Sequence, residues 1–292
     1  MCRARTRHRG GPRPECGGWL YAWCVTHIQQ DFYDDPAIYD VLHSPDTAEE
    51  VAGLVSTYRR FSRGPMKRMG RMPRWLEPAS GSGRYCIEAA GHEIRSVGVD
   101  LSEAMTAYAR ERARAMGVAR RCAFVAEDIQ EMRGAEGRGP FDFAFCPINS
   151  IRHLPSDAAM VRHLVRVREL LAPDAVYAVG ISLSKPEWEM PSEDVWEASR
   201  DGVHVKQVVQ YVPPVDGSRV EKVFSVMHVN ADGRSRTIES AYDLRTYTLG
   251  QWHAITKRAG MEIVATVNEE GEDLDVRELG YQVSVLAEAP RH

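Results

Sequence analysis

The sequence predicts an α/β fold, in which strands and helices alternate along the chain and the strands form a mainly parallel sheet. Short apolar runs alternate with amphipathic helical patterns from Trp75 to about residue 183. The first apolar run leads directly into a glycine turn, "GSG" at 81–83. The 292 residues suffice to bury a large core without disulfides, and a content of 43% hydrophobic and 27% charged residues is ordinary for a globular protein.

Each element of the α/β region has its own signal. The segment Thr47–Phe61 carries apolar residues at helical spacing, with acids early and arginines late, which predicts an amphipathic helix. A strand at Trp75–Leu76 enters the glycine turn, and "YCIEAAG" is expected to leave it as a helix. Ser102 and Ser156 are the expected N-caps of the next two helices, "SEAMTAYARERARAMG" and "SDAAMVRHLVRVRELLAP". The remaining strands are expected at "RSVGVD", "CAFVAED", "FDFAFCP" and "AVYAVGISL".

The pattern changes after residue 183. Residues 184–247 hold alternating, β-branched runs separated by "PPVDG" and "NADG", which predicts an antiparallel meander. A helix, "LGQWHAITKRAG", and two strands, "MEIVATV" and "YQVSVLAEA", follow. We therefore expect one α/β domain, built from 30–183 and 248–292, with a small antiparallel insertion at 184–247 covering the substrate site.

The amino-terminal residues 1–29 are expected to be a leader, disordered in part. They are rich in arginine and contain no acid before Glu15, which leaves a nucleic-acid arm or a transit peptide as alternatives. The apolar run "WLYAWCVTHI" is too short to span a membrane.

The net charge and the cysteine spacing limit the kinds of partner and metal that the chain is expected to bind. The formal net charge of −4 gives no overall attraction to nucleic acid or to an anionic membrane. The six cysteines form no CxxC pair and show no zinc spacing, so we expect reduced thiols, no metal and a cytoplasmic protein. We expect a monomer or homodimer.

The glycine turn indicates a nucleotide-like ligand. A nicotinamide dinucleotide fingerprint requires a third glycine at position 86, where this chain has Cys86. A P-loop is excluded because no Lys–Ser/Thr pair follows the glycines.

Four short motifs in order resemble class I S-adenosylmethionine-dependent methyltransferases. "LEPASGSGR" is similar to their glycine-rich first motif, "VGVDLSEAM" to the second, "VAEDI" to the end of the third strand and "PINSIRHL" to the fourth-strand region facing the substrate. The resemblance covers about residues 30–183 and implies a Rossmann-like sheet, S-adenosyl-L-methionine as cofactor and methyl transfer to a small molecule. Ala79 departs from the motif, since many members carry glycine there.

The chemistry of this cofactor agrees with the residues. Asp100, at the end of a strand, can accept from both ribose hydroxyls, and Gly81 and Gly83 let backbone N–H groups approach the methionine carboxylate. Glu77 is expected to attract the ammonium group or to hold the turn, and Asp128 with the Ile129 backbone to contact the adenine amino group. The resemblance adds four further cofactor contacts, Ala79, Leu101, Met105 and Pro147.

The methyl acceptor is expected to be an amine. "NSIRHL" resembles a stretch of sugar-amine N-methyltransferases, which implies His153 as general base; the alternative is a histidine that caps a helix or fills a loop. "DFYDDPAIYD" resembles their amino-terminal segment over the cofactor, with Tyr33 and Tyr39 at the reaction centre or, alternatively, packing a helix. The predicted substrate contacts are Asn149, Arg152, Trp188 and Tyr211, with Trp196 and Tyr242 as further aromatics that are either substrate cover or core.

Two other functions stay open from the sequence. One is a nicotinamide-dependent oxidoreductase, disfavoured by Cys86 and by the lack of a Tyr–xxx–Lys pair. The other is a non-catalytic cofactor-binding protein of the same fold, disfavoured by the intact first motif and Asp100.

Overall fold

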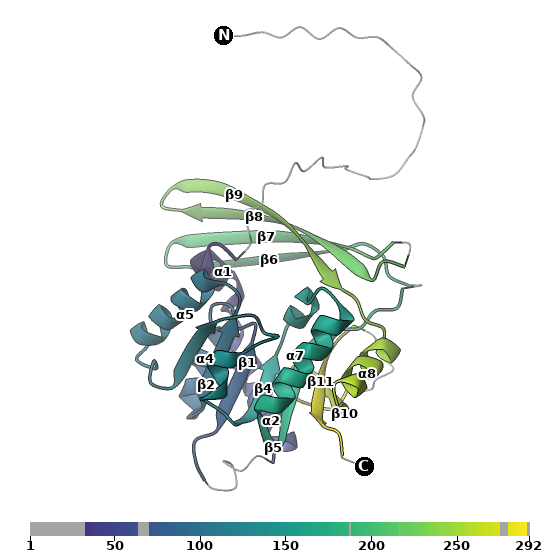
Figure 1. Ribbon diagram of the computed structural model, residues 1–292. Helices are drawn as coiled ribbons and strands as arrows, with labels where there is room; N and C mark the ends of the chain where they lie inside the picture. The colour runs from purple at the N-terminus through teal and green to yellow at the C-terminus, as the bar shows by residue number, and fades with distance from the viewer. Residues whose placement is uncertain (1–32, 64–69, 187, 216, 275–279, 291–292) are drawn as a thin grey trace, which may run out of the picture.

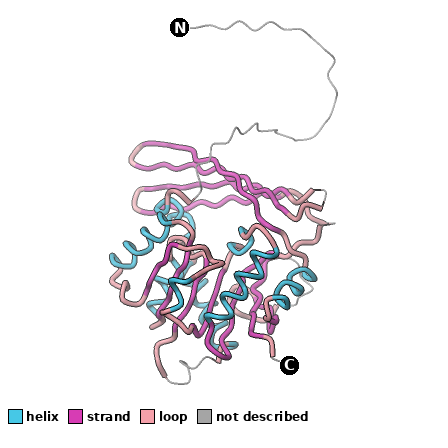
Figure 2. Tube along the Cα trace, viewed as in Figure 1, coloured by secondary structure: helices cyan, strands magenta, loops and turns pink. Residues whose placement is uncertain are grey.

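The computed structural model describes residues 33–63, 70–186, 188–215, 217–274 and 280–290. The predicted leader at 1–29 lies outside these residues. Two separate sheets organise the fold, a seven-stranded sheet flanked by helices and a four-stranded antiparallel sheet (Figures 1 and 2). In the described part of the chain, no helix is long and apolar enough to cross a membrane.

The seven-stranded sheet has the order β10-β11-β5-β4-β1-β2-β3. Its five strands from the α/β region run parallel, and only β11 pairs antiparallel with β5 and β10. The carboxyl ends of β1, β2 and β4 therefore meet at one edge, which is where ligands bind in open α/β sheets. The strands are β1 Arg74–Pro78, β2 Arg95–Asp100, β3 Cys122–Ala126, β4 Phe141–Cys146, β5 Leu171–Ser182, β10 Met261–Val267 and β11 Tyr281–Glu288.

The expected N-caps are confirmed. The hydroxyl of Ser102 accepts from Met105 N at 3.2 Å, and that of Ser156 accepts from Ala159 N at 3.1 Å. The helices are α1 Pro36–His43, α2 Thr47–Phe61, α4 Arg84–Ala89, η1 Ala90–His92, α5 Glu103–Ala115, α6 Arg133–Glu136, η2 Ser150–His153, α7 Asp157–Leu170 and α8 Leu249–Arg258.

One boundary differs from the expectation. The helical pattern was expected to reach Pro173, but α7 ends at Leu170 and β5 begins at Leu171. Leu171 pairs with Phe141 of β4, and Pro173 cannot continue a helix, so sheet pairing decides this segment.

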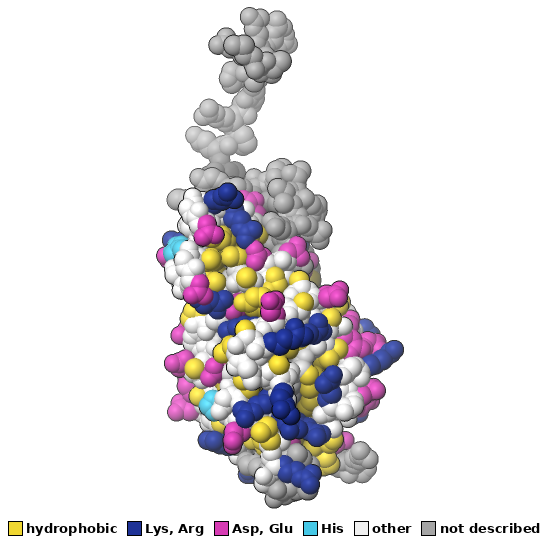
Figure 3. Space-filling model, turned by 90° about the vertical axis from the view of Figure 1, so that its left-hand side faces the viewer, with side chains coloured by type: hydrophobic (Ala, Val, Ile, Leu, Met, Phe, Trp, Pro, Cys, Tyr) yellow, Lys and Arg dark blue, Asp and Glu magenta, His cyan; other side chains and the backbone are white. Residues whose placement is uncertain are grey.

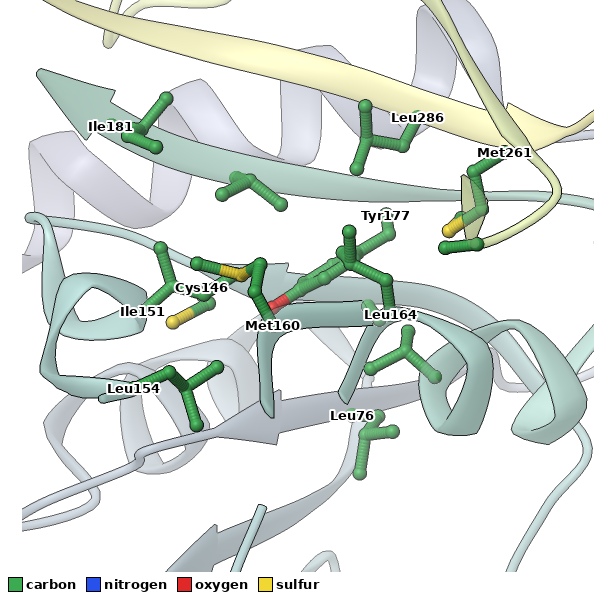
Figure 4. Packing of buried hydrophobic residues seen from close by; sticks show 14 of the residues in the cluster. Leu76, Cys146, Ile151, Leu154, Met160, Leu164, Tyr177, Ile181, Met261 and Leu286 are labelled. Carbon is green, nitrogen blue, oxygen red and sulfur yellow. The ribbon is translucent and has the colours of Figure 1, made fainter. Parts of the chain in front are cut away.

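The main core lies between the sheet and helices α7 and α8. Met160 and Leu164 of α7 pack against Tyr177 and Ile181 of β5 and Leu286 of β11 (Figure 4). These side chains are almost completely buried, which makes the sheet a rigid support for its carboxyl edge.

The predicted meander forms the second sheet, in the order β6-β7-β8-β9. Figure 1 shows it lying across the α/β layer, with α1 between the two. Ile38, Val41 and Leu42 of α1 pack against Val205 and Met227 of the sheet. The α1 helix thus joins the insertion to the α/β layer. The strands are β6 Ser192–Arg200, β7 Val203–Val212, β8 Val220–Ala231 and β9 Arg234–Arg245.

Candidate active site

The glycine turn follows β1 and is built from left-handed backbone. Gly81 and Gly83 have φ of 49° and 72°, and Ala79 has φ of 58°. A Cβ on Gly83 would come within 2.5 Å of the Phe124 ring, so only glycine fits there. Ala79 occupies a conformation that costs an L-residue energy and that glycine adopts freely, which explains why glycine is the usual residue at this place in the motif.

Asp100 holds the turn from the end of β2. Its Oδ2 accepts from Gly81 N at 2.7 Å and its Oδ1 from Ser102 N at 2.9 Å. Burial raises the pKa of Asp100, and the two backbone N–H groups act in the opposite direction. Each carboxylate oxygen keeps a second lone pair, so the group can accept from two ligand hydroxyls without releasing the turn.

Glu77 lies beneath the turn and is almost completely buried. Its Oε2 accepts from the Cys86 thiol at 3.0 Å. Burial raises the pKa of Glu77 to about 8, and a nearby cation would reverse that shift. Cys86 therefore fills the position of the missing third glycine as the hydrogen-bond partner of a buried acid.

The predicted adenine contacts lie after β3. Asp128 Oδ1 accepts from Gln130 N at 2.8 Å. The Ile129 carbonyl accepts from His163 Nδ1 at 2.9 Å, while Tyr177 OH lies 2.9 Å from His163 Nε2. Burial lowers the pKa of His163 to about 4, so this histidine is neutral and fixes the Ile129 backbone.

The other predicted cofactor contacts differ in exposure. Met105 at the start of α5 is fully buried, Pro147 after β4 is half-buried, and Leu101 after β2 is 76% exposed. An apolar side chain that is this exposed at the carboxyl edge is available to cover a ligand.

A buried carboxylate that the sequence analysis missed connects α1 to this turn. Asp40 accepts from Ser82 at 2.9 Å and from Tyr108 at 3.0 Å, and it pairs with Arg112 at 2.6 Å and Arg200 at 2.8 Å. Four elements therefore meet at one acid: α1, the glycine turn, α5 and β6. An acid among Ile38, Val41 and Leu42 on an otherwise apolar helix was the available signal.

Aromatic rings gather where α1, η2 and β9 meet, and we call Tyr33, Tyr39, His153 and Tyr242 the aromatic cluster. The Tyr33 hydroxyl lies 3.2 Å from His153 Nε2, and the His153 and Tyr242 rings are 5.2 Å apart. Tyr39 lies against the glycine turn, where a Cβ on Gly81 would be 3.7 Å from its Cε1. The structure thus brings together the predicted catalytic residues, from positions 120 apart in sequence for Tyr33 and His153.

Two tyrosines of the aromatic cluster have raised hydroxyl pKa values. Burial raises the pKa of Tyr39 to about 12 and raises that of Tyr242 as well. Both are therefore neutral hydroxyl groups at pH 7, suited to orient a ligand and unsuited to take its proton.

The four predicted substrate contacts differ in their burial and in the residues that they touch. Asn149 bonds to Ser182 through both amide atoms, at 2.9 and 2.6 Å, and so fixes η2 to β5. Arg152 is buried and joins Glu221 of the insertion at 2.8 Å. Tyr211 is half-buried and packs in the same group as Tyr242, whereas Trp188 is 78% exposed. Only Tyr211 is grouped with a member of the aromatic cluster.

These features define a class of protein. The family model described as "Methyltransferase domain" matches residues 76–174, from β1 into β5. Residues 76–174 therefore form a methyltransferase domain, and the sheet order and the glycine turn held by Asp100 agree with the S-adenosylmethionine-dependent class I fold that the sequence analysis expected.

One curated protein is similar to part of the chain. The protein YjhP of Escherichia coli (strain K12), named as uncharacterized, is 34% identical over 102 residues, which are 32% of this chain and 38% of YjhP. The chain thus covers less than half of that curated relative.

Three solved structures are similar over nearly their whole length. A S-adenosylmethionine-dependent methyltransferase from Clostridium acetobutylicum ATCC 824 has a TM-score of 0.66 at 14% identity, over 87% of this chain and 97% of the other. The sugar N-methyltransferase KedS8 from Streptoalloteichus sp ATCC 53650 gives 0.63 at 18% identity, over 96% and 99%. CalS10 from Micromonospora echinaspora, an amino pentose methyltransferase with S-adenosylmethionine bound, gives 0.57 at 21% identity, over 83% and 91%. The expected fold is confirmed, including the insertion as a separate sheet.

Proposed function

We propose that this chain transfers the methyl group of S-adenosyl-L-methionine to an amine nitrogen of a small molecule. The observation that carries the proposal is the hydrogen-bonding contact of Tyr33 with His153 at 3.2 Å, beside a glycine turn that Asp100 holds at 2.7 Å. Both contacts lie at the same edge of the sheet, which supports a proton acceptor beside a cofactor cradle.

The residues present suit this cofactor. Asp100 has two oxygens for vicinal hydroxyls, the Gly81 side of the turn is bounded by the Tyr39 ring, and Glu77 is a buried acid that a cation would ionise. Asp128 and the fixed Ile129 backbone would receive the adenine. When bound, the cofactor supplies an electrophilic methyl group on a sulfonium.

The protein's part in the reaction is to position the acceptor and take a proton. With the cofactor bound, the lone pair of the amine would form the new C–N bond as the methyl C–S bond breaks, S-adenosylhomocysteine would leave, and the N–H proton would pass to His153 Nε2. The Tyr33 hydroxyl lies 3.2 Å from that nitrogen and would orient the ring, and the incoming amine would take its place as the hydrogen-bond partner of Nε2. Positioning contributes about 7–11 kcal/mol to such reactions, and a general base about 10²–10⁴-fold.

A matched acceptor panel tests the proposal. The purified chain is incubated with S-adenosylmethionine and pairs of sugars that differ only in an amino or a hydroxyl group, a choice suggested by the sugar N-methyltransferase among the similar folds. We expect S-adenosylhomocysteine and N-methylated product with amines, measured by mass spectrometry. Methylation of the hydroxyl partners alone would contradict the choice of nitrogen, and binding without any turnover would favour a non-catalytic protein.

A further inference from the structure

A concave region lies at the opposite edge of the sheet from the aromatic cluster. It is a cavity of about 280 Å³ at the amino ends of β1, β2, β3 and β4. Because these strands are parallel, the glycine turn and Asp100 are at their other ends. The lining residues are Arg74, Arg95, Ser96, Val97, Ala119, Arg120, Arg121, Cys122, Ala123, Gly137, Arg138 and Phe141.

The charge of this cavity has one sign. Five of its lining residues are arginines and none is an acid. Figure 3, which views the molecule from the side of α5, shows Lys and Arg side chains grouped on the half away from the four-stranded sheet. The whole chain has a net charge of −4, so this concentration of cations runs against the overall composition.

Two of the five arginines are anchored by the fold. Arg74 Nη1 donates to the Gly139 carbonyl at 3.0 Å, and Arg121 Nη1 donates to the Ala90 carbonyl at 2.7 Å. Each guanidinium has five N–H donors, so both retain donors for a ligand.

The other three, Arg95, Arg120 and Arg138, are exposed. Within the part of the chain that the structure describes, they form no ion pair. Like charges in one cavity repel each other, and an anion would relieve that repulsion.

We propose that this cavity binds a small molecule carrying two or more phosphate groups. Guanidinium groups match phosphate oxygens with paired, directed hydrogen bonds. Five cations exceed what one phosphate engages, and the volume lies near the lower end of small-molecule sites, about 300–1,000 Å³. A concave site on an acidic protein favours a compact anion over a nucleic-acid strand. The site is separate from the methyl-transfer edge, so the proposal stands independently of the proposed function.

Inorganic tripolyphosphate is the probe, titrated into the full chain by calorimetry at low and moderate salt. We expect saturable binding that weakens as salt rises, since ionic contacts are screened. In the triple variant Arg95→Gln, Arg120→Gln, Arg138→Gln, the affinity should fall by about 10-fold or more. Affinity for S-adenosylhomocysteine should be unchanged in the triple variant, which shows that it is folded.

A charge-matched control removes three exposed cations elsewhere, Lys206→Gln, Arg234→Gln and Arg258→Gln. This control should bind tripolyphosphate like the unaltered chain. The proposal is overturned if the chain does not bind tripolyphosphate, or if both triple variants lose affinity equally. It is also overturned if a short single-stranded oligonucleotide binds more tightly than tripolyphosphate and depends on the same three arginines, since the site would then serve nucleic acid.

Discussion

The carboxylate of Asp40 accepts a hydrogen bond from the hydroxyl of Ser82 at 2.9 Å, which joins α1 to the middle of the glycine turn. The same carboxylate pairs with Arg112 of α5 and Arg200 of β6. A single buried acid therefore fixes the position of the proposed cofactor cradle relative to both α1 and the insertion.

Replacing Asp40 by alanine should destabilise the fold and weaken cofactor binding together. The change leaves two partly buried arginines and the hydroxyls of Ser44, Ser82 and Tyr108 without this acceptor, and breaking a buried ion pair from one side costs about 3–5 kcal/mol. Urea unfolding measures the loss. Asp243→Ala is the matched control, because its pair with Lys222 is 61% exposed on both sides and should change stability by less than about 1 kcal/mol. Equal unfolding midpoints for the two variants would show that the contacts of Asp40 do not stabilise the fold.

Asp100→Ala should weaken S-adenosylhomocysteine binding by about 10–100-fold. The variant removes the proposed acceptor for the ribose hydroxyls and also releases Gly81 N from its 2.7 Å bond, and hydrogen bonds to a charged acceptor contribute about 1.5–3 kcal/mol each. Calorimetry with the Asp243→Ala control measures the difference. Unchanged affinity would remove Asp100 from the site.

Cofactor binding at pH 7 should release a proton from Glu77. Burial raises the pKa of Glu77 to about 8, so about 0.9 of this group is protonated at pH 7 in the free protein. A ligand ammonium beside it stabilises the carboxylate and lowers its pKa, and the proton passes to the buffer. Calorimetry in buffers of different ionisation enthalpy counts the protons, and Glu77→Gln should release about 0.9 fewer. The same count in both proteins would place the ammonium elsewhere.

The raised pKa of Glu77 also sets a direction for stability against pH. The folded state holds the proton more tightly than the unfolded chain, whose ordinary value is 4.5. This contribution is fully present below about pH 4.5 and is lost as pH rises through about 8. Thermal unfolding from pH 5 to 9 should therefore show a steeper decline for the unaltered chain than for Glu77→Gln. Parallel curves would contradict a pKa that far from the ordinary value.

The sequence predicted most of the fold because its signals are local. Ser102 and Ser156 cap their helices as expected, and alternating runs after residue 183 became the second sheet. The start of β5 at Leu171 was missed: Pro173 indicates that the helix ends before it, but the pairing of Leu171 with Phe141 across the sheet has no local signal.

The candidate site was predictable in part. Residues at strand ends follow from the motif. The resemblance implied a place near the reaction centre for Tyr33 and for His153 separately, and their 3.2 Å contact comes from the structure alone. The contacts of Asp40 outside α1 were missed because Ser82, Tyr108, Arg112 and Arg200 lie 42 to 160 positions away, and no local pattern pairs an acid in α1 with Arg200. The ion pair of Arg152 with Glu221 was also missed, because Glu221 lies in the insertion, far from Arg152 in the sequence.

The last prediction concerns the base. His153→Ala should lower kcat by about 10²–10⁴-fold and leave S-adenosylhomocysteine affinity nearly unchanged, because the proposed role of the imidazole is to take the acceptor's proton. Tyr33→Phe removes the hydroxyl at 3.2 Å and should lower kcat less, since the ring still contacts His153. The matched control is His228→Ala, an exposed histidine of β8 that bonds Thr237 at 3.1 Å and should retain full activity. Added imidazole should restore turnover to His153→Ala alone, which a merely structural histidine would not allow. If His153→Ala keeps full activity, catalysis proceeds by positioning, with Tyr33 or Tyr39 orienting the acceptor; the Tyr39 hydroxyl, whose pKa is about 12, can orient it but cannot replace the base at pH 7.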